Sequence, residues 1–259
     1  MKKLFLIGGL ICIFLSFLLK DCFFNFEPQK DLILIAHAGG AFNGQIYLNS
    51  KEAVENAIKN GFHYIELDLL ETSDGDLVAA HDWKMFHQLT GFSAQEHPIT
   101  QKEAQERKIL KNQTVLTSKE IHDIFVSNPT LYLVTDKIQN IDLLNKKFGD
   151  FKDRIIVEVF SIERYKEVQE KGFFHPAFCV WDSEKLYQLV DENQIDMITL
   201  SGDSVYQKIK WYKKHPEITA FAFTSKNGIA NNKKAIQGLL PHINGWYTDF
   251  LTPKMFLEN

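Results

Sequence analysis

Eight short runs of apolar and β-branched residues recur along this chain, and they constrain its fold more than any other feature. Several, such as Leu32–Ala36, are apolar without a break, as parallel strands covered on both faces are. Segments with helical spacing lie between them. The chain therefore predicts an α/β fold, a (β/α)₈ TIM barrel over residues 31–259. The predicted strands are Leu32–His37, His63–Leu69, Leu131–Asp136, Arg154–Phe160, His175–Trp181, Ile195–Ser201, Ile218–Thr224 and Gly245–Asp249.

The intervening segments predict seven helices. Asn49 with Glu52, and Thr117 with Glu120, have the spacing of capping boxes at two helix starts. The last unit is short, because only ten residues follow Asp249. The predicted helices are Asn49–Asn60, Thr117–Ser127, Ile141–Phe148, Ile162–Lys171, Glu184–Glu192, Ser204–Lys214 and Asn231–Leu240.

Two segments interrupt the alternation. The Asp74-Gly75 step is a turn signal, which predicts that Leu77–His81 folds back on the second strand as a β-hairpin. The polar stretch Trp83–Gln113 then predicts a long loop insertion before the third strand, and long loops are usually functional or disordered.

The first 30 residues differ from the rest. Lys2 and Lys3 precede Leu4–Leu19, which carries no charge. This layout predicts an N-terminal apolar helix within residues 1–20, acting as an uncleaved signal-anchor, with a linker over residues 21–30 and the barrel outside the cytoplasm. A cleaved signal peptide and a helix buried in the domain remain alternatives.

Composition excludes several classes of protein. The chain has 29 basic and 33 acidic residues, a net charge of −4, which argues against a nucleic-acid partner. Apolar residues make up 45% of it, which excludes a disordered chain. Its three cysteines, Cys12, Cys22 and Cys179, are too few for a disulfide scaffold or a multi-cysteine zinc module.

Glu66 and Asp68 lie two residues apart in an apolar strand. Because side chains alternate along a strand, both carboxylates point to the same face. Two acids there are costly unless something compensates for them. A hard divalent cation, Mg²⁺ or Ca²⁺, is the simplest candidate; lysines inside the barrel are the alternative.

His37 ends the first predicted strand and His81 ends the hairpin arm. Both can reach the carboxyl-end face of the barrel, where barrel enzymes carry their chemistry. Two imidazoles can serve as general base and general acid. Together with a cation, they provide the groups that cleavage of a phosphodiester requires.

This set of residues resembles the glycerophosphodiester phosphodiesterase family, whose pattern includes H-R-G, E-N-T, I-E-x-D and T-x-D-G-x2-V-x2-H-D. The matching segments are His37-Ala-Gly-Gly, Asn49-Ser50, Ala53-x3-Ala57-x3-Gly61, Ile65-Glu66-Leu67-Asp68 and Thr72-x-Asp74-Gly75-x2-Val78-x2-His81-Asp82. The resemblance implies a barrel fold, a cation on Glu66 and Asp68, and His37 and His81 as the acid–base pair. It also implies attack by a neighbouring substrate hydroxyl through a cyclic phosphate.

The chain departs from the family pattern at two places. Ala38 replaces the arginine of H-R-G, and Thr135 stands at the glutamate of the family's E-x-K, whose lysine corresponds to Lys137. Two acids are therefore alternative candidates for the third metal ligand. Asp136 is one residue out of phase and would need a local bulge to point inward, whereas Glu158 is a charge in an apolar strand.

Three further residues are candidates for substrate binding. Lys137 would stabilise the phosphate charge. Asn49 corresponds to the asparagine of E-N-T and would face the site, or else would only cap a helix. Trp181, with Phe223, Trp246 and Tyr247, lies near a strand end and would line a pocket for the alcohol, or else pack in the core.

The predicted function is hydrolysis of glycerophosphodiesters, either lipid headgroups or substituents of an envelope glycan. The predicted partners are that small-molecule or lipid-derived substrate and, through the N-terminal helix, a membrane. Two alternatives stay open: a glycoside hydrolase, which would have no use for His37 and His81, and a non-catalytic barrel that binds a glycan or headgroup. Ala38 and Thr135, both losses of charge, motivate the second.

Overall fold

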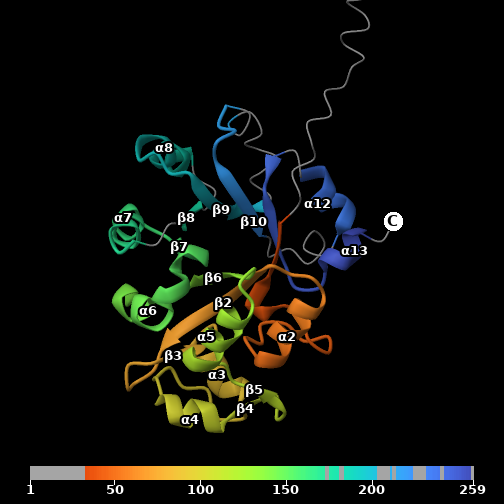
Figure 1. The fold of residues 1–259 in the computed structure, drawn as a ribbon, viewed down its shortest axis with the longest axis vertical. Helices are drawn as coiled ribbons and strands as arrows, with labels where there is room; N and C mark the ends of the chain where they lie inside the picture. Colours follow the sequence, from red (N-terminus) through yellow and green to blue (C-terminus); the bar gives the residue numbers. More distant parts are fainter. Residues whose placement is uncertain are drawn as a thin grey trace, which may run out of the picture. The chain divides into compact units, whose positions relative to one another are not determined.

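The computed structural model describes residues 33–172, 175–180, 184–202, 211, 214–223, 232–239 and 242–257. All of them belong to one compact unit. Its eight parallel strands close into a barrel (Figure 1), which confirms the predicted fold class. The strands are β1 (Ile33–Ala36), β2 (Tyr64–Glu71), β6 (Tyr132–Asp136), β7 (Ile155–Val159), β8 (His175–Val180), β9 (Met197–Ser201), β10 (Thr219–Phe223) and β11 (Gly245–Thr248).

The barrel closes because β1 pairs with both β11 and β2. Ile35 lies opposite Tyr247 on one side and Tyr64 on the other. The remaining strands pair in chain order from β6 to β11, and β2 pairs with β6. All eight barrel strands therefore run in the same direction, and their carboxyl ends meet at one face.

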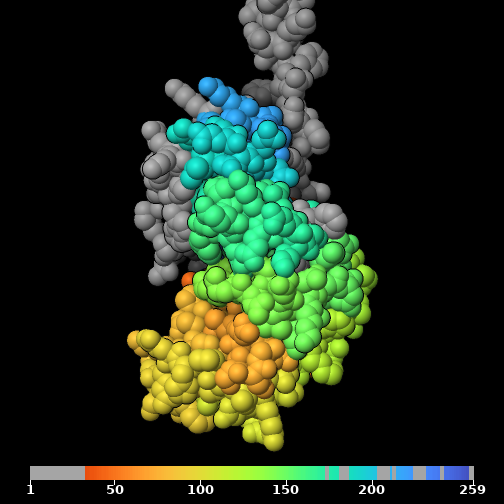
Figure 2. All heavy atoms as spheres, turned by 90° about the vertical axis from the view of Figure 1, so that its left-hand side faces the viewer, coloured from red at the N-terminus to blue at the C-terminus, as the bar shows by residue number. Residues whose placement is uncertain are grey.

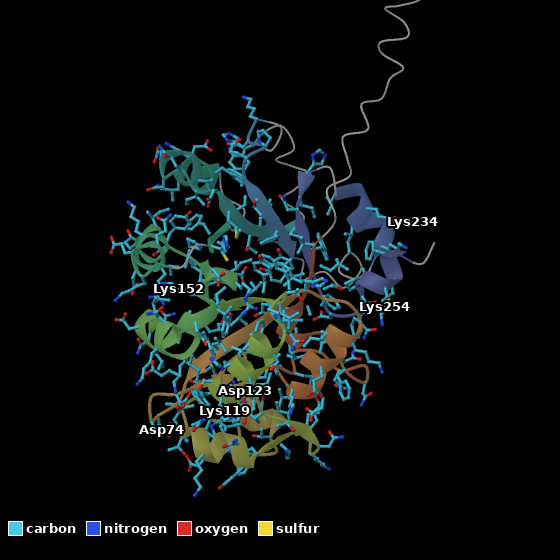
Figure 3. All side chains as sticks on the ribbon, in the orientation of Figure 1. Asp74, Lys119, Asp123, Lys152, Lys234 and Lys254 are labelled. Carbon is cyan, nitrogen blue, oxygen red and sulfur yellow. The ribbon has the colours of Figure 1, made fainter. Side chains whose placement is uncertain are left out.

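Helices cover the outside of the barrel (Figure 1). The last of them, α13, follows β11, and its Lys254 donates to the carbonyl of Lys59 at the end of α2 (2.7 Å; Figure 3). The predicted helix Ser204–Lys214 lies largely outside the described residues. The described α-helices around the barrel are α2 (Lys51–Lys59), α5 (Ser118–Ser127), α6 (Ile141–Phe148), α7 (Ile162–Glu170), α8 (Glu184–Glu192), α12 (Lys233–Leu239) and α13 (Pro253–Leu257).

The strands alternate between two apolar layers. One set of side chains fills the barrel interior, including Ile35, Val134, Ile156 and Phe221. The intervening positions, such as Leu133, pack against the helices in a larger core. Each such side chain contributes about 1.5–3 kcal/mol when fully buried. This alternation also decides which strand residues can reach the carboxyl-end face from inside.

The insertion after β2 is folded, in contrast to the predicted loop. β3 (Leu77–Ala79) pairs antiparallel with β2. The apolar residues of the insertion, among them Phe86 and Ile109, form a separate core with Val78 of β3. Figure 2 shows this part, in yellow, as a closely packed body rather than an extended chain. It comprises α3 (Trp83–Leu89), α4 (Gln101–Glu106), β4 (Lys108–Ile109) and β5 (Gln113–Thr114).

Side-chain caps fix the insertion to the barrel. Thr100 begins α4 with a capping box, and Asp74, at the turn between β2 and β3, accepts from the backbone N–H of Gln101 (2.9 Å; Figure 3). The hydroxyl of Thr72 donates to the same carboxylate (2.6 Å). The turn signal of the sequence therefore also anchors the neighbouring helix.

The predicted capping box at Asn49 and Glu52 is wrong by one residue. Ser50 is the N-cap of α2 and accepts from the backbone N–H of Ala53. Glu52 instead accepts from the N–H and hydroxyl of Thr114 at 2.8 and 2.9 Å. The box at Thr117 and Glu120 is present as predicted.

The predicted leader, residues 1–30, lies outside the described residues. Within the part of the chain that the structure describes, no helix is long and apolar enough to cross a membrane.

Candidate active site

A cavity of about 380 Å³ opens at the carboxyl ends of the barrel strands. Strand alternation explains its lining, because the interior-facing positions of the strands continue into it. In β7, Ile156 belongs to the interior core and Glu158, two residues later, lines the cavity. The lining consists of His37, Tyr47, Glu66, Asp68, His81, Asp136, Lys137, Glu158, Phe160, Cys179, Thr199, Phe223, Tyr247 and Asp249.

Three buried carboxylates meet at the floor of this cavity. One oxygen from each of Glu66, Asp68 and Asp136 lies within 4.8 Å of the others. Asp136 Oδ1 is buried and has no hydrogen-bond partner among the described residues. Carboxylate oxygens are the ligands that Mg²⁺ and Ca²⁺ prefer. The donor set therefore fits a hard divalent cation.

When they are ionised, the three carboxylates repel one another. Burial, followed by the charges of Asp68 and Asp136, raises the pKa of Glu66 well above its usual range. Burial and the charge of Asp68 raise the pKa of Asp136 to about 7. Burial and the neighbouring negative charges both disfavour the ionised carboxylates, and a bound cation would offset this effect.

Asp136 needs no bulge to point inward, contrary to the interpretation from the sequence. It pairs in register with Asp68, directly after Thr135 with Leu67, so the regular alternation of β6 directs it into the interior. Thr135 points the other way. The motif comparison placed Asp136 out of phase because it matched Lys137 to the lysine of E-x-K, which puts Thr135 at the glutamate position.

Glu158, the other candidate for the third ligand, lies apart from this carboxylate group. It accepts a hydrogen bond from the hydroxyl of Tyr247 (2.8 Å), and Cys179 Sγ lies 3.9 Å from it. Burial raises its pKa. The geometry favours Asp136 as the third ligand and gives Glu158 a place on the cavity wall.

His37 is oriented by a carboxylate. Its Nδ1 lies 2.9 Å from Asp249 Oδ1, so that Nε2 is the nitrogen left for the substrate. Burial alone would lower the pKa of His37, but the hydrogen bond and charge of Asp249, with Asp68 and Glu158, outweigh it and raise that pKa.

His81 has an equivalent arrangement, since its Nδ1 lies 2.7 Å from Asp82 Oδ2. Tyr47 stands between the two histidines, with ring centroids 4.6 Å from His37 and 5.8 Å from His81, edge-on to both. Its backbone is left-handed, with φ 59°. The tyrosine ring therefore contacts both imidazoles.

Asn49 lies beneath the site rather than in the cavity lining. Its amide nitrogen donates to Asp68 Oδ2 (2.9 Å), and its amide oxygen accepts from the backbone N–H of Asp68 (3.1 Å). Nearby, the N–H of Ala38 donates to Glu66 Oε2 (2.6 Å). Both metal-site acids of β2 are thus held by the loop that follows β1.

Lys137 is the only lysine or arginine in the described lining of this cavity. Its ammonium lies 2.7 Å from Asp136 Oδ2 and 3.8 Å from Asp68 Oδ1. Burial lowers its pKa, but the neighbouring carboxylates raise it further, so the net shift is upward. Lys137 therefore stays charged beside the carboxylates of the cavity.

The aromatic candidates divide among three places. Phe223 and Tyr247 line the cavity. Trp246 is fully buried in the outer core. Trp181 lies outside the described residues, and its predicted substrate contact stays a prediction.

Tyr47 and Asp249 are among the lining residues to which the sequence reasoning gave no role in the site. The alternation of β11 from Gly245 through Tyr247 carries a signal for Asp249. Tyr47 has no comparable signal, because it lies in an irregular segment whose path is set by contacts with both histidines.

A parallel barrel with two imidazoles, a cluster of three acids and one lysine at its carboxyl-end face defines a class of α/β barrel with a site suited to a divalent cation. The family model of the glycerophosphoryl diester phosphodiesterase family matches residues 40–238. The chain belongs to this family and is a phosphoric diester hydrolase, which confirms the resemblance. The match begins three residues after His37 and ends before Asp249.

Solved structures show the same fold at low sequence identity. A glycerophosphoryl diester phosphodiesterase from Parabacteroides distasonis is 15% identical, with a TM-score of 0.67 over 88% of this chain and 86% of its own. The enzyme from Thermotoga maritima is 18% identical, with a TM-score of 0.64 over 88% and 98%. An Oleispira antarctica phosphodiesterase in complex with sn-glycerol-3-phosphate is 15% identical, with a TM-score of 0.63 over 84% and 92%. No curated protein matches.

Proposed function

We propose that this chain hydrolyses glycerophosphodiesters, with His37 and His81 as the acid–base pair beside a divalent cation. The observation that carries the proposal is the single cavity that brings both imidazoles, three carboxylates and Lys137 together. A glycoside hydrolase would have no use for the two histidines. The sn-glycerol-3-phosphate bound by the Oleispira antarctica phosphodiesterase is the product expected of such a reaction.

Glu66, Asp68 and Asp136 are the residues that would hold Mg²⁺ or Ca²⁺. The unpartnered Oδ1 of Asp136 and the mutual repulsion of the three acids support this assignment. A bound cation would withdraw charge from the phosphate oxygens. Asn49 and the N–H of Ala38 orient Asp68 and Glu66 by hydrogen bonds, which restrict how far these two carboxylates can move apart.

The two histidines would exchange roles during the reaction. One imidazole removes the proton from the glycerol hydroxyl next to the phosphate, and that oxygen forms a bond to phosphorus. The bond from phosphorus to the alcohol breaks, and the other imidazole protonates the departing alkoxide. Water then opens the cyclic phosphate by the reverse proton transfers, which yields glycerol phosphate.

Lys137 would take the place of the arginine that Ala38 replaces. Lys137 lines the cavity, and its ammonium lies beside Asp136. Charge-assisted hydrogen bonds to phosphate oxygens do not depend on the strand from which the cation comes. The loss of the arginine therefore leaves phosphate recognition in place, with one cation instead of two.

The proposed location of this activity is the cell envelope, and it rests on the sequence of residues 1–20 alone. If residues 1–20 anchor the chain with the barrel outside the cytoplasm, the substrates are deacylated lipid headgroups or glycerophosphate groups on an envelope glycan. Fractionation of cells that produce the full chain, with protease protection, would test the location.

The assay for the activity is release of glycerol phosphate from glycerophosphodiesters by the purified chain. We expect turnover with Mg²⁺ or Ca²⁺, loss of turnover with EDTA, and a loss of about 10²–10⁴-fold in His37→Ala and His81→Ala. His122→Ala is the matched control, because His122 binds Asp150 (2.8 Å) outside the cavity. Full activity in either active-site variant would refute the mechanism. Binding without turnover would favour the non-catalytic barrel.

A further inference from the structure

The insertion Trp83–Gln113 differs in charge from the chain as a whole. It has five lysines and arginines against three acidic residues, whereas the whole chain has a net charge of −4. Three of these five basic residues lie in Arg107–Lys111, a stretch that contains no acidic residue. Lys108 and Lys111 are exposed, and neither has an ion-pair partner among the described residues. Their charges are therefore available to an anionic surface.

The same stretch contains a hairpin turn that exposes a leucine. The turn joins β4 to β5, and in it the N–H of Asn112 donates to the carbonyl of Ile109 (3.2 Å). Its two central residues, Leu110 and Lys111, have φ of 47° and 74°, as a type I′ turn requires. Asn-Gly is the preferred pair in such a turn, because left-handed backbone is unfavourable for leucine and lysine. The turn therefore presents these two side chains at a local cost in stability that Asn-Gly would avoid.

A second exposed apolar residue lies beside this turn. Phe92 is 54% exposed and Leu110 is 38% exposed. Both are attached to the last turn of α3, because their N–H groups donate to the carbonyls of His87 and Leu89 respectively (both 2.8 Å). The Arg107 guanidinium lies 3.8 Å from the centroid of the Phe92 ring. The arginine therefore holds the ring in place, and more than half of Phe92 stays open to solvent.

We refer to these exposed and basic residues together as the insertion tip. None of them lines the described catalytic cavity, and Figure 1 shows β4 and β5 away from strands β7 to β11. Apolar side chains among basic ones are the combination that binds the interface of an anionic bilayer. A nucleic acid would require a more extensive basic surface. The insertion tip consists of Phe92, Arg107, Lys108, Leu110 and Lys111.

We propose that the insertion tip docks on a lipid bilayer with anionic headgroups and holds the barrel in one orientation on it. Phe92 and Leu110 enter the headgroup region, and the three basic residues of the tip face the lipid phosphates. The contact is separate from residues 1–20 and is present whether or not the leader is cleaved. It is also independent of the proposed hydrolysis.

The test places an environment-sensitive NBD fluorophore at the tip of the full chain. Leu110→Cys is labelled in a chain that carries Cys12→Ser and Cys22→Ser, since the remaining Cys179 is buried. Vesicles of phosphatidylcholine alone are compared with vesicles of equal parts phosphatidylcholine and phosphatidylglycerol. We expect a blue shift and a rise in emission with the anionic vesicles only. Both should disappear in about 1 M NaCl, where the Debye length is about 3 Å.

Two sets of variants locate the response in the tip. Lys108→Gln combined with Lys111→Gln should remove most of the rise in emission, because each lysine at an anionic surface contributes about fivefold to partitioning. Lys119→Gln combined with Lys234→Gln, at exposed lysines of α5 and α12 (Figure 3), is the matched control and should keep the rise. The same label on Val126→Cys, at a 48% exposed position of α5, should not respond to either vesicle.

The difference between the two vesicles reports the tip, because insertion of the apolar leader into a bilayer does not require anionic lipid. Equal emission at position 110 in both vesicles would overturn the inference, and so would an equal response at position 126. An emission change that grows with protein concentration in the absence of vesicles would overturn it as well, and would assign the tip to contacts between copies of this chain. None of these results bears on hydrolysis of glycerophosphodiesters.

Discussion

His37 Nδ1 lies 2.9 Å from Asp249 Oδ1, although 212 residues separate them in the chain. The contact exists because β1 and β11 are neighbours in the closed barrel, where Ile35 pairs with Tyr247. His37 comes two residues after Ile35, and Asp249 comes two residues after Tyr247. Both side chains therefore lie at the same face of the barrel. Barrel closure is therefore what orients the first histidine.

Asp249→Asn should lower kcat/KM roughly 10²-fold, because it removes the carboxylate that orients the His37 imidazole. The carboxylate also raises the pKa of His37. In its absence His37 loses its proton at a lower pH. A base that must be neutral then becomes active at lower pH, and the acidic limb of the pH–kcat/KM profile should move to lower pH.

The matched control for this change is Asp150→Asn, which removes the partner of His122 in a histidine–carboxylate pair outside the cavity. It should leave both the rate and the pH profile as in the parent chain. A rate loss in Asp249→Asn with an unshifted acidic limb would contradict the orientation of His37 by Asp249.

Tyr47 should position His37 and His81 through its aromatic ring rather than through its hydroxyl. Tyr47→Phe keeps the edge-on contacts with His37 and His81 and should stay within about threefold of the parent rate. Tyr47→Ala leaves both imidazoles less constrained and should lower kcat by about 10- to 100-fold, as misplaced catalytic groups do. Tyr132→Ala, which removes a ring stacked on Tyr64 at 4.8 Å, is the control for general loss of an aromatic contact. A large defect in Tyr47→Phe would instead assign the role to the hydroxyl.

Asn49→Ala should weaken cation binding without altering the ligands themselves. It removes both hydrogen bonds that hold Asp68, and loss of such supporting contacts costs about 10–100-fold in metal affinity. Titration calorimetry with Mg²⁺ or Ca²⁺ would measure the change. Asn56→Ala, on α2 and outside the cavity lining, is the control; its amide donates to the Ala41 carbonyl at 3.1 Å. Equal affinity in Asn49→Ala would contradict the positioning role.

The carboxylate group should make cation-free stability depend on pH. The pKa of Asp136 is about 7 in the folded chain, against roughly 3.9 when unfolded. The folded state therefore binds more protons between those values, and its stability falls as pH rises through that window. In EDTA, the Tm difference between the parent chain and Asp136→Asn should grow in favour of Asp136→Asn from pH 5 to pH 8.

Added Mg²⁺ or Ca²⁺ should reverse this trend in the parent chain. A cation binds the deprotonated carboxylates, so its stabilising effect should be larger at pH 8 than at pH 5. Thermal melts with and without cation at both pH values would measure it. An equal rise in Tm at the two pH values would mean that these acids do not bind the cation.

Sequence patterns predicted what depends on local periodicity. Apolar runs identified the eight strands, and the two-residue spacing placed Glu66 and Asp68 on one face. The inward direction of Asp136 follows from the regular alternation of β6. The motif comparison missed it because it matched Thr135 and Lys137 to the family's E-x-K. The folded insertion was missed because Phe86 and Ile109 find their core only across the hairpin.

Asp82 both caps a helix of the insertion and contacts the proposed catalytic residue His81, and substitutions can separate these two roles. Oδ1 accepts from the backbone N–H of Met85 (2.7 Å) and caps α3, while Oδ2 contacts His81 Nδ1. Asparagine is about as good an N-cap as aspartate, whereas alanine costs about 1 kcal/mol. Asp82→Asn should therefore keep the Tm and lose about tenfold or more in kcat, because the charge beside His81 is gone. Asp82→Ala should lower both the Tm and kcat.

Thr100→Ala is the control, because it removes only the cap of α4. It should lower the Tm and leave kcat unchanged. A loss of kcat in Thr100→Ala would mean that the stability of the insertion alone accounts for the effect of Asp82.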